Sequence, residues 1–201
     1  FLAAQDSGRV MNRLTYDNQV IGGITMGIGL AATEEVMVLA GTSGVGLYHA
    51  GRWHQLRAAA GLPPSGATCS AVAGDGHLWV GTSDTGLLRT DAPVTAAALA
   101  EWQVGGADPA GREVAHGVLS SPETLRGVLP PGILTLAWAE GRLWVGTESG
   151  LWGVGGSPPR VELHLARAGG LGGSTVRGVV WSPRWQTLWV SQGGGLAEVD
   201  P

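Results

Sequence analysis

One short phrase recurs along the 201-residue chain and limits the possible folds more than any other feature. It reads LWVGT, a few polar residues and then GL near Gly76 and Gly141, and it returns as LWVSQGGGL after Thr187, with Ser191 and Gln192 in place of Gly and Thr. A weaker copy, VLAGTSGVGLYHA, begins at Val38. The copies are about 40, 65 and 45 residues apart, and a β-rich unit with a period in the forties is typical of propeller blades. The interval of about 65 residues corresponds to one blade plus an insertion. By sequence alignment, the equivalent central positions of the four copies are Leu39, Trp79, Trp144 and Trp189.

The residues around each copy repeat as well. A run of small and β-branched residues comes first (ITMGIGLAA, ATCSAVAG, ILTLAWAE, VRGVVWS), and three copies end on a further strand-like run (GRWHQL, AEWQV, RVELHL). Four short antiparallel strands joined by tight turns make one propeller blade. The sequence therefore predicts an all-β fold, a single β-propeller domain over residues 1–201 with about four four-stranded blades.

The letters of the phrase have separate physical roles. In a strand, Leu78 and Val80 point to one face and Trp79 to the other. Both faces of a blade pack on neighbouring blades, so we expect the indoles to fill the wedges between blades. The glycine of the LWVGT strand indicates a close approach of backbones. The glycine that opens the next strand indicates a positive φ, and this applies to Gly86, Gly150 and Gly195.

The chain ends suggest how the ring closes. The last copy stops after its third strand, whereas Arg9–Tyr16 has strand character and no blade of its own. We expect Arg9–Tyr16 to pair with Leu196–Val199 and so remove an exposed edge, with residues 1–20 as closing strand and linker. The alternative is a piece of a larger ring, whose last blade stays open or pairs with another chain.

A non-repetitive segment, residues 105–132, interrupts the pattern between the second and third blades. Within it, SPETLRGVL predicts a short helix with Ser121 as N-cap, Pro122 at the first helical position and Glu123 in the first turn. Long insertions on rigid scaffolds often carry binding. The helix is expected either to dock a partner or to pack back on its own blade. The apolar residues proposed for docking are Leu119, Leu125 and Leu129.

The LWVGT…GL phrase resembles the two-component-regulator propeller repeat of bacterial sensor proteins. The resemblance covers about four units, most of the chain outside the N-terminus and the insertion. It implies a propeller, and it implies a ligand-sensing domain of the kind found outside the cytoplasm. We therefore favour an extracytoplasmic location.

Composition excludes several classes of function. The formal charge is −4 and every basic residue is arginine, which leaves no basic footprint for nucleic acid. The single cysteine, Cys69, can form neither an internal disulfide nor a cysteine zinc site. The longest apolar run, Val20–Ala32, is too short and glycine-rich to cross a bilayer. Its GIGLAA stretch is followed by a turn and a strand, not by the helix that a dinucleotide site needs. We expect no cofactor and no metal.

The sequence contains no convergent set of nucleophile, general base and acid. We therefore expect a non-catalytic binding or scaffold module rather than an enzyme. The alternative is a hydrolase or lyase of propeller fold that acts on a glycan.

The working surface follows from propeller geometry. Turns between the second and third strands of each blade share one face with the segments that join consecutive blades. That face, including the insertion, is predicted to bind a protein partner or a small-molecule ligand. The candidate residues are Ser43, Ser83, Asp84, Arg112, His116, Glu148 and Gln192.

Overall fold

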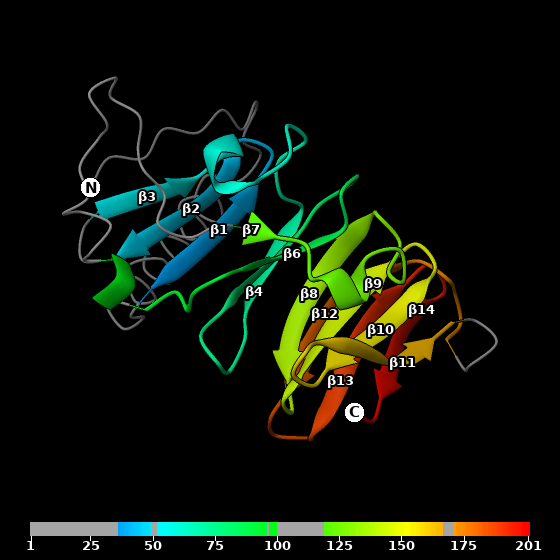
Figure 1. Cartoon of the computed structure of the whole chain (residues 1–201). Helices are drawn as coiled ribbons and strands as arrows, with labels where there is room; N and C mark the ends of the chain where they lie inside the picture. The colour runs from blue at the N-terminus through cyan, green and yellow to red at the C-terminus, as the bar shows by residue number, and fades with distance from the viewer. Residues whose placement is uncertain (1–35, 50–51, 96, 100–118, 167–170) are drawn as a thin grey trace, which may run out of the picture.

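The computed structural model describes residues 36–49, 52–95, 97–99, 119–166 and 171–201. Four antiparallel sheets follow one another along this part of the chain, so the expected all-β class is confirmed (Figure 1). The predicted closing strand Arg9–Tyr16 and the run ITMGIGLAA lie outside the described residues, and so does AEWQV. Within the described residues, no helix is long and apolar enough to span a membrane.

Within each sheet the strands are adjacent in chain order. The first sheet contains β1 (Met37–Gly41), β2 (Gly44–His49) and β3 (Arg52–Leu56). The second contains β4 (Cys69–Val72), β5 (Leu78–Gly81), β6 (Leu87–Thr90) and β7 (Leu119–Ser120). The third contains β8 (Ile133–Ala139), β9 (Arg142–Thr147), β10 (Gly150–Gly155) and β11 (Arg160–Leu165). The fourth contains β12 (Val176–Ser182), β13 (Thr187–Gln192) and β14 (Gly195–Val199).

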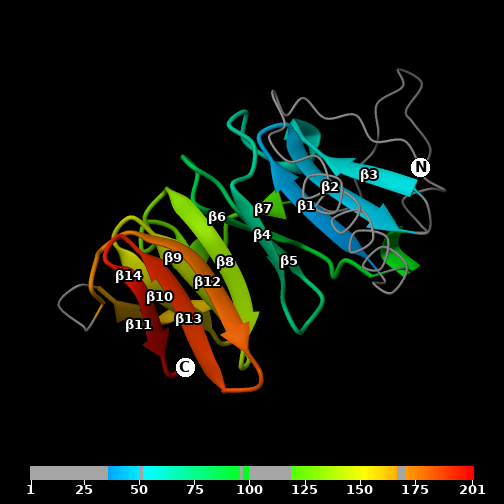
Figure 2. The same cartoon turned by 180° about the vertical axis from the view of Figure 1, so that it is seen from behind.

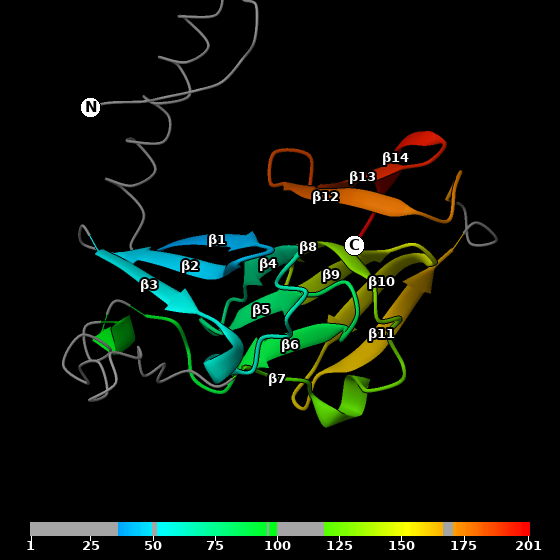
Figure 3. The same ribbon diagram turned by 90° about the horizontal axis from the view of Figure 1, so that it is seen from above.

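Apolar clusters join the sheets in sequence, and the succession forms an arc (Figure 3). Leu78 and Val80 face the first sheet, whereas Trp79 faces the third and belongs to the same apolar cluster as Ile133. Trp144 is fully buried between the third and fourth sheets. The predicted alternation is therefore confirmed, and the indoles of Trp79 and Trp144 do fill the wedges between sheets.

The glycines of the phrase behave as expected. A Cβ built on Gly146 would lie 2.4 Å from Thr135 Cγ2 and 2.7 Å from Val176 Cγ1. Gly81 is as crowded, with Cys69 Sγ at 2.5 Å. These residues allow the strand to approach both its own inner strand and the next sheet. The glycines after the turn have positive φ, 91° at Gly86, 139° at Gly150 and 123° at Gly195.

The first copy is shifted by one residue from its sequence alignment. In the third sheet Thr147 pairs with Gly150 across the turn, and in the first sheet Gly41 pairs with Gly44 in the same way. This register places Val38, not Leu39, at the position of Trp144. A one-residue shift turns each side chain to the other face. Val38 accordingly packs on the core, whereas Leu39 is 52% exposed.

The insertion lies inside the second sheet rather than between the second and third sheets. β7 pairs with β6 through Arg89 with Ser120 and Thr90 with Leu119. The fourth strand of this sheet therefore comes after most of the insertion. The expected boundaries 105–132 thus include both a strand of the second sheet and the connection to the third.

The predicted helix is shorter and differently capped. Only Glu123–Leu125 is helical, as the 3₁₀ turn η2, and Pro122 precedes it with φ −56° and ψ 127°. Ser121 makes no capping bond, because the extended Pro122 stands between it and the turn. Leu119, Leu125 and Leu129 are all buried, so they do not form an exposed docking stripe. This segment packs back on the sheets, as the alternative expected.

In the described residues, the first and fourth sheets do not pair with each other and lie at opposite ends of the succession (Figure 2). The four sheets have three, four, four and three strands. The arrangement of the described sheets is propeller-like, and these sheets by themselves do not form a closed ring.

Candidate functional site

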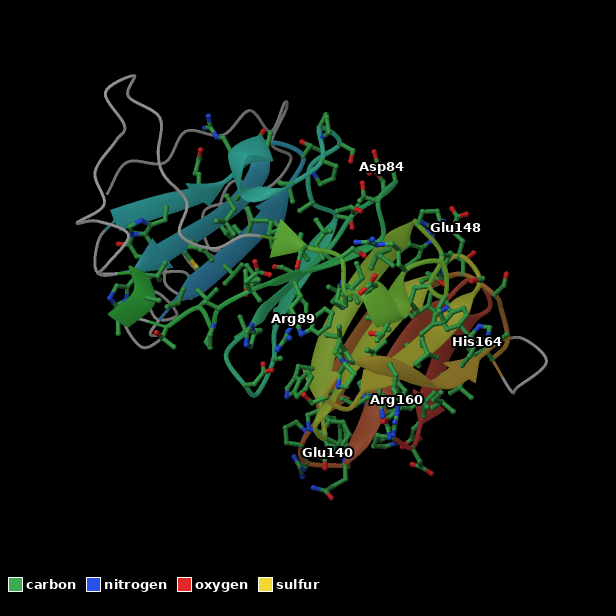
Figure 4. The ribbon with its side chains drawn as sticks, viewed as in Figure 1. Asp84, Arg89, Glu140, Glu148, Arg160 and His164 are labelled. Carbon is green, nitrogen blue, oxygen red and sulfur yellow. The ribbon has the colours of Figure 1, made fainter. Side chains whose placement is uncertain are left out.

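One face of the arc carries the turns between the second and third strands of each sheet. Asp84 and Glu148 lie on this face, and Glu140, from the β8–β9 turn, lies on the opposite face (Figure 4). The segments that join consecutive sheets run along the same face as Asp84 and Glu148. Ile133 N–H donates to Thr82 O at 2.9 Å, and Gly173 N–H donates to Gln192 Oε1 at 3.1 Å. In the described residues, the turns and the connecting segments therefore lie on one face, as expected.

The threonine of the phrase holds each turn in shape. Thr147 Oγ1 donates to Gly150 O and accepts from Ser149 N–H and from Trp152 Nε1–H, each at 3.1–3.2 Å. Thr82 repeats the scheme, donating to Gly86 O at 2.8 Å and accepting from Thr85 N–H at 3.1 Å. Both threonines are fully buried. The turns are therefore rigid supports for the residues at their tips.

A cleft of about 490 Å³ opens between two of these turns. Ser83 lies on one wall and Glu148 on the other, so two predicted site residues share one cavity. The apolar connection between the second and third sheets lines it from Pro130 to Leu134. Thr68 and Ser149 complete the wall. A cavity of this size is within the range of small-molecule sites.

Glu148 is the charged group of this cleft. Its side chain is exposed at the tip of the β9–β10 turn. Its carboxylate makes no hydrogen bond or ion pair with the described residues, in contrast to Thr68, whose hydroxyl donates to Ile133 O at 2.6 Å. A carboxylate beside an apolar wall favours a ligand with a cationic group attached to an apolar body.

The other predicted residues are not part of the cleft. Asp84 accepts from Ser65 Oγ at 2.7 Å and from Thr85 Oγ1 at 3.0 Å. The Ser65 bond is the main cause of the lowered pKa of Asp84. Gln192 anchors the connection to the fourth sheet through Gly173, and Ser43 is exposed in the β1–β2 turn. Arg112 and His116 lie outside the described residues.

A second, smaller cavity on the opposite face was missed by sequence reasoning. It has a volume of about 90 Å³ and lies between the second and third sheets, with Trp79, Arg89 and Trp138 in its wall. Arg89 bonds Asp75 Oδ2 at 2.8 Å, and its guanidinium lies 5.5 Å from the centre of a Trp79 ring. Arg89 on β6 is the register partner of Trp79 on the adjacent strand β5, so strand alternation could have indicated this contact.

The pKa of Asp75 is lowered in this second cavity. Burial alone would raise it, but the bond from His77 N–H and the charges of His77 and Arg89 outweigh that effect. The ion pair is half exposed on the Asp75 side. It therefore holds the turn before β5 against β6 more than it prepares a reactive group.

The described residues do not gather three or more His, Cys, Asp or Glu side chains around a point that could hold a metal ion. Burial raises the pKa of the Cys69 thiol. Hydrogen bonds to Thr68 and to the Gly81 backbone lower the pKa again in part, but the net shift remains upward. Cys69 is thus held in its neutral form beside Gly81, at the contact between the second and third sheets. It contributes packing rather than a nucleophile.

Comparisons with known proteins give two partial likenesses. Residues 1–49 match the model of a molybdopterin cofactor-binding domain. The fold is similar to the extracellular domain of a putative hybrid two-component system from B. thetaiotaomicron, with a TM-score of 0.48 and 12% identity. That likeness covers 84% of this chain and 19% of the other, so the chain spans about a fifth of the protein it matches. No curated protein matches the chain.

Only residues 36–49 of the molybdopterin match lie in the described part of the chain. They form β1 and β2, whose inward side chains Val45 and Leu47 are fully buried against the second sheet. None of them lines the cleft or the second cavity. The described part of the match therefore forms a sheet–sheet contact.

Proposed function

We propose that this chain is a non-catalytic binding module that takes its ligand in the cleft between Ser83 and Glu148. The observation that supports it is the combination of an apolar wall, Pro130–Leu134, with one exposed carboxylate that has no partner among the described residues. Rigid turns present these groups, so the cleft needs little rearrangement to accept a ligand. Preorganisation of this kind lowers the entropic cost of binding.

The ligand proposed is an apolar body that carries a basic group. Its source is either a free amphipathic amine or a lysine or arginine side chain on a short peptide segment. The insertion does not favour a large protein partner, because its apolar residues Leu119, Leu125 and Leu129 are buried and offer no exposed docking stripe. The resemblance of the LWVGT repeats to extracytoplasmic sensor domains supports the same role, and we include that location in the proposal.

Isothermal titration with a matched panel tests the proposal. The panel contains aryl-alkyl amines, the corresponding carboxylates, and short peptides with arginine or lysine beside an apolar residue. We expect amines or basic peptides to bind and carboxylates not to bind. Titration of amines against peptides distinguishes the two sources.

Two variants locate the binding. Glu148→Gln keeps the shape of the side chain and removes its charge, and we expect affinity to fall by about tenfold, roughly 1.4 kcal/mol. Glu140→Gln is the matched control, because Glu140 is an exposed glutamate in the turn at the other end of the same sheet. Equal binding by both variants would place the ligand elsewhere. Reproducible turnover of a glycan would instead make the chain an enzyme.

A further inference from the structure

The fourth sheet presents an apolar face that the described residues leave uncovered. We call it the tail face, and its apolar residues are Val180 and Leu196 on the strands, Trp185 in the β12–β13 turn, and the half-buried Trp189. Val180 is 64% exposed, Trp185 63% and Leu196 70%. Trp185 meets Trp189 edge to face at 6.2 Å. Large apolar side chains gathered in this way mark an interaction site more often than scattered ones do.

Strand register shows what this face is built to receive. Trp189 pairs with Val180, as Trp144 pairs with Ala137 in the third sheet. Leu196 lies across the turn from Ser191, as Leu151 lies across from Gly146.

In the third sheet these positions form the contact with the next sheet. Trp144 and Leu151 are fully buried there, and Ala137 packs beside them. At Val180, Trp189 and Leu196 the tail face thus repeats a face that elsewhere is covered by another sheet of the same repeat. It differs in that Trp185 belongs to the β12–β13 turn and that the exposed Glu198 stands beside Trp189, where the third sheet has Gly153.

The first sheet carries the opposite half of such a contact. We call its outward face the head face, with Met37 and Leu39 on β1. By register these residues occupy the positions of Leu143 and Val145, which are fully buried and receive the second sheet. Leu39 is nevertheless 52% exposed. The head face is therefore a receiving surface without a covering sheet in the described part of the chain.

We propose that the tail face of one molecule binds the head face of a second copy of this chain. The contact would continue the sheet-on-sheet stacking that Trp79 and Trp144 form inside the molecule. It joins two different surfaces, so the interface is heterologous and leaves one free face at each end of a pair. Neither face belongs to the cleft, so this inference stands apart from the proposed ligand.

Complementation between two variants tests the proposal by light scattering after size-exclusion chromatography. Val180→Glu with Leu196→Glu disables the tail face, and Leu39→Glu disables the head face. We expect the mass of the unaltered protein to rise with concentration and each variant alone to be monomeric. An equimolar mixture of the two variants has one intact tail and one intact head, so it is expected to form a one-to-one dimer.

Val128→Glu is the control, because Val128 is 50% exposed on the connection to the third sheet and lies on neither face. It should associate like the unaltered protein. Circular dichroism and thermal melting confirm that each variant folds, and Leu196→Ser replaces the double variant if that one does not. A protein that is monomeric at all concentrations overturns the proposal. So does self-association by the Leu39→Glu variant, which indicates tail-to-tail contact, and so does a mixture that stays monomeric.

Discussion

Alanine at two glycines that sequence alignment treats as equivalent should have opposite effects on stability. Gly41 and Gly146 both stand in the letters GT of the repeated phrase. By strand register, however, Gly41 takes the place of Thr147. Nothing lies within 4 Å of a Cβ on Gly41, whereas one on Gly146 meets the side chains of Thr135 and Val176 and, at 3.0 Å, the backbone oxygen of Val176.

The magnitudes follow from these contacts. Overpacking a closely packed site costs about 1–3 kcal/mol. The upper end applies to Gly146→Ala, because a backbone atom of β12 must move as well as two methyl groups. Replacing a glycine by alanine in a compatible conformation recovers about 0.4–1 kcal/mol from the unfolded state. We therefore expect a net loss of about 2 kcal/mol for Gly146→Ala and a gain of up to about 1 kcal/mol for Gly41→Ala.

Urea unfolding and thermal melting measure the difference. For a chain of this length, 2 kcal/mol corresponds to a fall in Tm of about 4–8 °C. Gly41→Ala should melt at or slightly above the temperature of the unaltered protein. Equal losses at both positions would show that Gly41 is packed like Gly146, and the one-residue shift of the first copy would then be wrong.

Two further predictions concern the buried threonine and the cysteine. Thr147→Val leaves Ser149 N–H and Trp152 Nε1–H without their acceptor and should lower the free energy of unfolding in urea by about 1–3 kcal/mol. Thr187→Val loses a single hydrogen bond to Val199 O and should lower the free energy of unfolding by less. A larger loss for Thr187→Val than for Thr147→Val would contradict the role given to Thr147. The raised pKa of Cys69 means that the unfolded chain loses its thiol proton first. The stability that this neutral thiol contributes is complete below the ordinary thiol pKa and is lost as pH rises through the folded pKa. Melting temperatures from pH 8 to pH 10 should therefore fall more for the unaltered protein than for Cys69→Ala, and parallel curves would rule this out.

The strands of the repeat could be predicted because each letter of LWVGT has a local reason. Alternation places Leu78 and Trp79 on opposite faces whatever the rest of the chain does. The shift at Val38 could not be predicted, because the letters GTSG look the same whether the turn begins at Thr42 or one residue later. Only the pairing of Gly41 with Gly44 shows where the turn lies.

The site was predictable at the level of a face and not at the level of a cavity. Ser83 and Glu148 could be assigned to one end of the fold from strand order alone. Their shared cleft depends on Ile133 bonding back to Thr82, a contact between residues far apart in sequence. Leu119 looked available for docking because a two-residue strand leaves no periodic signal, and β7 was therefore not expected.

The late position of β7 also bears on how the molecule assembles. All strands of the third sheet lie between Ile133 and Leu165 and are joined by short turns. The second sheet must wait for the chain to return from Thr90 to Leu119 before its last strand can pair. Closing longer loops costs more entropy, and non-local pairing is slower than local pairing. We therefore expect the third sheet to form first and to provide the surface on which the second sheet is completed.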